Sequence, residues 1–110
     1  MANVIKLVQG DSRPSLVVTL TDKKTGIPLN LTGTSPVLKF REEGASELTG
    51  VVPGAVVDPV NGVCVFHWSE VPGILDGPTG NYEGEIEITY EDTSIQTVFD
   101  QLYFYMREQF

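Results

Sequence analysis

Cysteine and histidine are almost absent from this chain, which has 110 residues and one of each. Because Cys64 has no second cysteine, no intrachain disulfide can form, and the secreted domains that depend on disulfides are excluded. The thiol is expected to be a small core residue of a protein that folds in a reducing cytosol. His67 is the single possible centre for a histidine metal site or a Ser–His–Asp arrangement. Since it alternates with Val63 and Val65, we predict a partly buried structural side chain, with Cys64 pointing the other way.

Long apolar runs and positive charge are also scarce. No apolar stretch approaches the roughly 20 residues of a membrane-spanning helix, and residues 1–6 lack the features of a secretory signal peptide. The chain has seven basic and fifteen acidic residues, which gives a formal net charge of −8. Nucleic acids and anionic membranes both attract basic patches, so neither is an expected partner. These shortages predict a soluble protein made inside a cell.

The apolar residues that are present recur with a period of two, which is typical of half-buried strands. The expected strands lie near residues 4–8, 16–20, 27–31, 37–41, 48–52, 63–68, 82–90, 95–99 and 102–106. Turn signals separate them at a spacing of roughly 8–12 residues, which indicates a β-sandwich or a small barrel. No window has the apolar spacing of an amphipathic helix. We predict a single all-β domain over residues 1–110, with about seven to nine strands.

The strand that begins at Tyr82 has the clearest alternation in the chain. Tyr82 follows a corner rich in glycine and proline, and in sandwich domains such a tyrosine hydrogen-bonds back to the backbone, so we assign it that stabilising role. The opposite face carries Glu83, Glu85 and Glu87, about 7 Å apart because a strand rises roughly 3.3–3.4 Å per residue. A straight row of carboxylates does not converge as calcium ligands must, so a solvated face is the favoured interpretation. A docking face for a basic partner is the other one.

The C-terminal strand is rich in aromatic residues. Its alternation places one set of side chains in the core, namely Leu102, Phe104 and Met106. Tyr103, Tyr105 and the later Phe110 then point outward, where a protein interface would explain them. Burial on both sides within the monomer would explain them as well. The candidate interface residues are therefore Tyr103, Tyr105, Phe110, Glu83, Glu85 and Glu87.

No arrangement of residues indicates catalysis. A phosphate cradle needs a glycine-rich loop between a strand and a helix, and the chain has no such loop. No motif singles out a pair of carboxylates for glycoside hydrolysis. The chain is predicted not to be an enzyme, and neither a metal nor another cofactor is expected.

The order and spacing of several turn and strand signals resemble the immunoglobulin-like N-terminal domain of phage baseplate upper proteins. The matching segments include Gln9-Gly10-Asp11 with Pro14, Leu20-Thr21-Asp22, Leu31-Thr32-Gly33, Asn61-Gly62, Trp68 and Gly80-Asn81-Tyr82. The resemblance extends from about Ile5 to Met106. It implies an immunoglobulin-like antiparallel β-sandwich, used as a structural module in the tail or baseplate of a bacteriophage or prophage virion and synthesised in the bacterial host cytoplasm.

On this interpretation the partners are other virion or tail proteins, and a homo-oligomer is a further expectation. Exposed sheet edges, such as the N-terminal strand and the segment at Pro28, would be docking sites because their backbone groups are unpaired. The alternative function is a carbohydrate-binding or host-adhesion module. It would bind a glycan receptor through exposed aromatic residues such as Trp68 and Tyr90. Fold alone does not separate the two functions.

Overall fold

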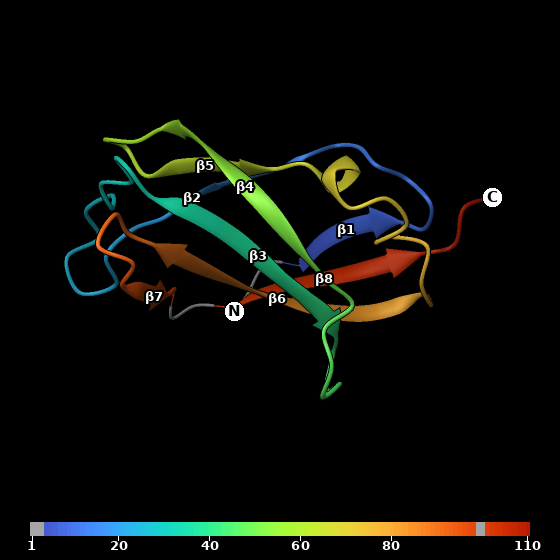
Figure 1. Cartoon of the computed structure of the whole chain (residues 1–110). Coiled ribbons are helices and arrows are strands. Elements are labelled where there is room, and N and C mark those ends of the chain that lie inside the picture. The colour runs from blue at the N-terminus through green and yellow to red at the C-terminus, as the bar shows by residue number, and fades with distance from the viewer. Residues whose placement is uncertain (1–3, 99–100) are drawn as a thin grey trace.

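The computed structural model describes residues 4–98 and 101–110, and in this part of the chain it contains eight strands and one 3-10 turn. The strands are β1 (Val4–Val8), β2 (Leu16–Thr19), β3 (Ser35–Glu42), β4 (Gly50–Asp58), β5 (Val63–Phe66), β6 (Gly80–Thr89), β7 (Ile95–Thr97) and β8 (Leu102–Arg107), and the turn η1 spans Trp68–Glu70. Their arrangement confirms the predicted all-β, sandwich-like fold (Figure 1).

The strands follow the order β1-β8-β6-β3-β4-β5-β2, and β7 pairs with β6. β4 takes part in two pairings, because residues 50–53 pair with β3 and residues 54–58 pair with β5. We call β1, β8, β6, β7, β3 and the first half of β4 the large sheet, and the second half of β4, β5 and β2 the small sheet. β4 passes between the two at Gly54, where a side chain would be impossible without movement, since a Cβ atom would lie 2.6 Å from Phe66 Cε1.

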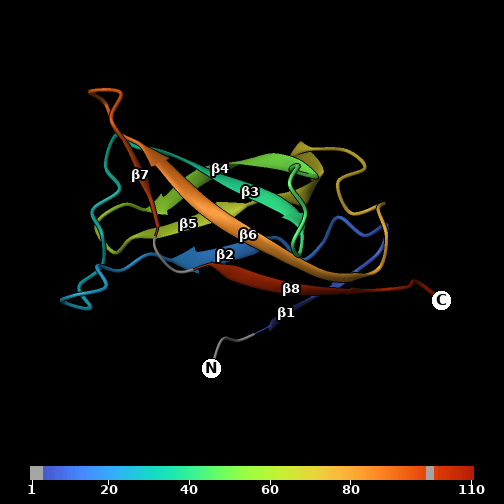
Figure 2. The same cartoon turned by 90° about the horizontal axis from the view of Figure 1, so that it is seen from below.

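One pairing departs from the antiparallel arrangement that we expected. β1 runs parallel to β8, with Val4 opposite Tyr103 and Val8 opposite Arg107. The two strands lie along one border of the molecule (Figure 2). The chain then leaves the large sheet after β1 and enters the small sheet as β2, which pairs with β5. The N-terminal segment therefore contributes one strand to each sheet.

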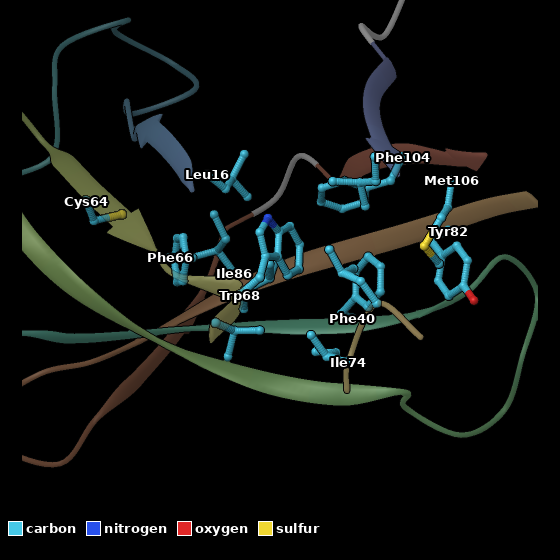
Figure 3. Close-up of a cluster of buried hydrophobic side chains, with 14 of the residues drawn as sticks. Leu16, Phe40, Cys64, Phe66, Trp68, Ile74, Tyr82, Ile86, Phe104 and Met106 are labelled. Carbon is cyan, nitrogen blue, oxygen red and sulfur yellow. The ribbon is translucent and has the colours of Figure 1, made fainter. Parts of the chain in front are cut away.

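The core lies between the sheets and is formed by the inward positions of both. Its centre is an aromatic cluster in which the Phe40 ring stacks on Tyr82, with centroids 4.8 Å apart, and meets the edges of Trp68 and Phe104 (Figure 3). As predicted, Cys64 is buried. Met106, predicted to face inward, is buried as well, and so are Leu38, Phe66, Ile86 and Ile88, which occupy the inward positions of their strands.

Two local turns confirm expectations from the sequence. The Tyr82 hydroxyl donates a hydrogen bond of 2.6 Å to the Pro78 carbonyl, as the corner before β6 predicted. Asn61 and Gly62 form the turn between β4 and β5, and Gly62 has a φ of 70°. A Cβ atom at Gly62 would lie 2.4 Å from the Leu20 carbonyl oxygen, so the close approach also requires glycine.

Four predicted strands differ from the structure. The strand predicted at 63–68 ends at Phe66, because the chain turns at Trp68 into η1. Residues 27–31 form no strand, because the segment makes only an isolated bridge between Thr21 and Pro28, and proline has no N–H group to extend a ladder. Ile27 is exposed there, whereas Leu31 is buried. The strand predicted at 48–52 begins at Gly50 and continues to Asp58. The strand predicted at 95–99 is observed at 95–97 with Ile95 exposed, and Phe99 lies outside the described residues.

Candidate protein interaction surfaces

The two groups of candidate interface residues lie beside each other on the outer side of the large sheet. Glu83 on β6 is directly opposite Tyr103 on β8 in the antiparallel register. Tyr103 in turn lies opposite Val4 on β1. We call this surface the mixed face, and its outward side chains include Val4, Lys6, Lys39, Arg41, Val51, Glu83, Glu85, Glu87, Tyr103 and Tyr105.

Glu83, Glu85 and Glu87 form a row on β6 that we call the acidic row, and ion pairs with β3 partly neutralise its charge. Arg41 Nη2 lies 2.7 Å from Glu83 Oε1, and Lys39 Nζ lies 2.7 Å from Glu87 Oε2. The side chains of Glu83 and Glu87 are only 13% and 21% exposed, so the row is not the fully solvated face that we favoured. The register of β3 against β6 brings each cation to its acid, which alternation within one strand cannot reveal.

Lys39 is directly opposite Glu85 in the register, yet it binds Glu87 on the diagonal. Its hydrogen bond to Glu87 raises the pKa of the Lys39 ammonium above its usual value, and burial opposes this rise. Within the described residues, Glu85 is the one acid of the row without an ion pair. It lines a shallow depression of about 100 Å³ together with Leu48 and Gln101.

The aromatic residues of β8 alternate as the sequence predicts. Phe104 and Met106 are buried, Tyr103 is half-buried, and Tyr105 is 47% exposed. Phe110 is fully exposed, and its ring lies 5.0 Å from the Arg107 guanidinium carbon at the end of the strand. The outward tyrosines therefore border the acidic row, whereas Phe110 lies at the C-terminal end of the same strand.

The small sheet has an outer side that is nearly all aliphatic, and the sequence analysis did not identify it. Val17 on β2 is opposite Val65 on β5, which is opposite Ala55 on β4. We call this surface the aliphatic face, and its residues are Val17, Thr19, Ala55, Val57, Val63 and Val65. Val17 and Val57 are 62% and 61% exposed. The signal in the sequence was the adjacent valines at 17–18 and 56–57, which give a strand an apolar residue on both sides.

The prediction for His67 was wrong, because its side chain is exposed. The antiparallel register places Leu16 opposite Phe66, so Ser15 comes to lie beside His67 and its Oγ is 2.6 Å from the ring Nδ1. A hydrolytic triad also needs an acid on the other ring nitrogen. Among the described residues no carboxylate is hydrogen-bonded to His67. The pair instead lies at the edge of a pocket that includes Arg13.

The proposed glycan platform is not on the surface. Trp68 is 2% exposed, since η1 turns its indole into the aromatic cluster beside Phe40 and Phe104. Tyr90 is half-buried, and its hydroxyl donates a hydrogen bond to Gln96. The prediction that Trp68 could stack on a sugar was therefore wrong.

In the part of the chain that the structure describes, no group of three or more histidine, cysteine, aspartate or glutamate side chains is arranged to hold a metal ion. None of the helical structure within residues 4–98 and 101–110 has the length and apolar character needed to cross a bilayer.

Comparisons with known proteins show a likeness in fold but none in sequence family. No protein-family model matches the sequence, and no curated protein matches it. Among solved structures, the fold is similar to the N-terminal domain of phage TP901-1 ORF48, with a TM-score of 0.60. The two share 17% sequence identity, and the match covers 98% of this chain and 86% of that chain. At this identity the likeness establishes a shared fold, that of a domain found in a phage protein.

Proposed function

We propose that this chain is a structural module of a phage tail or baseplate, and that it binds other virion proteins through the mixed face without catalysing a reaction. The observation that carries the proposal is the position of Tyr103 directly opposite Glu83, with Tyr105 two residues further along β8, on one side of the large sheet. The likeness to a domain of a phage protein and the turn signals shared with baseplate upper proteins both support this assignment.

The chemistry of the mixed face suits a protein partner. Tyrosine is enriched at interfaces because its ring buries a large apolar area while its hydroxyl can still be hydrogen-bonded. The Tyr103 hydroxyl donates to Gln101 Oε1 at 3.3 Å, and Tyr105 is 47% exposed. The ion pairs of Lys39 and Arg41 reduce the charge of the acidic row, so a partner would meet both signs of charge. We therefore propose a partner surface with aromatic or aliphatic side chains and a few charges, in place of a purely basic one.

The edge of the large sheet adds a second means of contact. Among the strands that the structure describes, β1 pairs with β8 alone, so its other side offers backbone groups that can accept an added strand. Val4 is exposed at this edge and Lys6 points outward from it. A partner that adds a strand to β1 would also cover Tyr105, which lies opposite Lys6. The same edge is the proposed contact if the chain forms a homo-oligomer.

Incorporation into phage particles tests the proposal. Particles assembled with the unchanged chain, with Tyr103→Ser plus Tyr105→Ser, or with Val17→Thr plus Val57→Thr would be purified and labelled with an antibody against the chain. We expect the tyrosine pair to reduce labelling by at least about tenfold, because interface tyrosines commonly contribute strongly to binding. The valine pair is the matched control on the opposite side and should label normally. Absence of the unchanged chain from particles, or equal labelling of both variants, would contradict the proposal.

A further inference from the structure

We propose that the pocket formed by the β1–β2 connection and the end of β5 binds the phosphate group of a small organic ligand. The pocket has a volume of about 440 Å³, and it is lined by Ser12, Arg13, Pro14, Ser15, His67 and Ser69. This volume is within the range of roughly 300–1,000 Å³ that small-molecule sites occupy. The site lies on the small sheet, away from the mixed face, so it is independent of the proposed function.

The charge of the lining is opposite to that of the protein. The chain has a formal net charge of −8, yet the six lining residues include an arginine and a histidine and no acid. The nearest acids along the sequence are Asp11, which accepts a hydrogen bond from Gln109, and Glu70 in η1. Neither acid lines the pocket. An anion would therefore meet a local cation in a molecule that otherwise repels it.

The hydrogen-bond donors of the lining come from Arg13, from serine hydroxyls and from His67. A guanidinium has five N–H donors in a planar fork that matches phosphate oxygens, and the hydroxyls of Ser12 and Ser69 each add one more. Arg13 has no ion-pair partner within the described residues, so its donors are available to a ligand. When the Ser15 hydroxyl donates to His67 Nδ1, the proton of the neutral ring lies on Nε2, which becomes a further donor. Phosphate is the common biological anion with enough acceptor oxygens for this set.

The folding of the chain assembles this site from distant segments. Ser15 and His67 are 52 positions apart in the sequence, and the pairing of Leu16 with Phe66 holds their backbones side by side. Ser69 follows in the 3-10 turn, whose buried Trp68 anchors the turn to the core. Ser15 and His67 thus lie at the end of the small sheet and Ser69 lies in a packed turn, whereas Ser12 and Arg13 lie in the β1–β2 connection.

The single histidine makes the test direct, because its imidazole signals in a ¹H–¹³C NMR spectrum have one possible assignment. Inorganic phosphate, glucose 6-phosphate, glucose and sodium chloride would each be titrated at constant pH and ionic strength. We expect saturable shifts of the His67 signals with both phosphate compounds and none with glucose or chloride. Stronger binding of glucose 6-phosphate than of inorganic phosphate would identify the organic part as a contributor. Equal shifts with chloride or with glucose would overturn the proposal.

Matched variants test whether Arg13 provides the charge. Arg13→Gln should weaken phosphate binding by at least about tenfold, since a guanidinium–phosphate pair is a charge-assisted contact. Lys24→Gln removes the same charge from an exposed turn, where the Lys24 backbone N–H binds Asp22, and should leave affinity unchanged. Both substituted positions are exposed, so both variants should fold. Unchanged affinity in Arg13→Gln, or an equal loss in Lys24→Gln, would overturn the assignment of this pocket.

Discussion

The mixed face and the aliphatic face cover the same core from opposite sides, but their outward residues have little in common. The mixed face pairs Arg41 with Glu83 and presents Tyr105. The aliphatic face has valines in cross-strand rows, with Val17 opposite Val65. Core packing constrains only the inward positions, so it explains neither composition. The difference teaches that the inward residues of a sheet do not fix its outward ones, so that one small domain has two outer surfaces of different chemistry.

The inward residues, in contrast, form one shared interior. Phe40 from the large sheet contacts Trp68, which follows β5 of the small sheet, and the cluster of buried residues draws on both sheets. Substitutions inside should therefore affect the whole domain. Substitutions outside should affect one face at a time.

The largest effect is expected from Phe40→Ala, which removes a fully buried ring from the centre of the aromatic cluster. Deleting a buried aromatic side chain costs about 3–5 kcal/mol, through lost burial and the cavity that remains. Denaturant unfolding followed by tryptophan fluorescence would measure the loss. Tyr105→Ala on the mixed face is the control and should cost far less. Comparable losses in the two variants would mean that inner and outer positions do not differ as described.

The junction between the sheets is the next most sensitive position. Gly54→Ala would place a Cβ atom 2.6 Å from a ring carbon of the buried Phe66, so the strand or the ring must shift. Overpacking of this kind costs about 1–3 kcal/mol. The neighbouring Ala55→Ser, on the exposed side of the same strand, should change the unfolding free energy by less than about 0.5 kcal/mol. An unchanged Gly54→Ala stability would show that β4 can pass between the sheets without the close contact.

Alkaline pH is expected to lower the unfolding free energy through two groups, the Cys64 thiol beneath the aliphatic face and the Lys39 ammonium on the mixed face. Burial raises the pKa of the Cys64 thiol to about 11, from an ordinary value of 9.0. Because the folded pKa is the higher one, this contribution to stability is complete below pH 9 and is lost as pH rises through 11, by about 2 kcal/mol at that pH. The hydrogen bond to Glu87 also raises the pKa of Lys39 on the outer surface. Its contribution to the unfolding free energy is therefore lost at alkaline pH as well.

Unfolding free energies measured between pH 8 and 11 would compare these two groups. Cys64→Ala should remove most of the alkaline loss, whereas Lys39→Gln should remove little, because solvent screens a surface ion pair. A remaining loss is expected from Tyr82, since burial and then the Glu42 charge raise the pKa of its hydroxyl. A pH profile that Cys64→Ala leaves unchanged would contradict the buried position of the thiol.

The smallest effects are expected on the two outer faces themselves. Glu83→Gln breaks the ion pair with Arg41 and should cost less than about 1 kcal/mol, with a smaller cost at high salt. Val17→Thr keeps a β-branched side chain on the aliphatic face and should change the unfolding free energy by less than about 0.5 kcal/mol, with no salt dependence. Thermal unfolding at two salt concentrations would compare them. A salt-dependent Val17→Thr or a salt-independent Glu83→Gln would remove the electrostatic distinction between the faces.

Much of the fold followed from the sequence because alternation is a local property of a strand. The inward positions of β6 and β8 could be assigned from the spacing of Ile86, Ile88, Phe104 and Met106 alone. The hydrogen bond from Tyr82 to Pro78 closes within a few residues, so a glycine- and proline-rich corner was enough to predict it. The outward direction of the acidic row and of the β8 tyrosines followed from the same periodicity.

The tertiary structure decided what depends on register and on contacts between distant segments. Alternation places Glu83, Glu87 and the cations of β3 on outward positions, but only the pairing of β3 with β6 joins them. The sequence predicted a structural role for His67, and only the pairing of β2 with β5 shows that it lies beside Ser15. The sequence by itself therefore determined most of the strands, their buried sides and the class of fold. Which surface residues meet was decided by strand pairing, because that pairing joins segments that no local pattern relates.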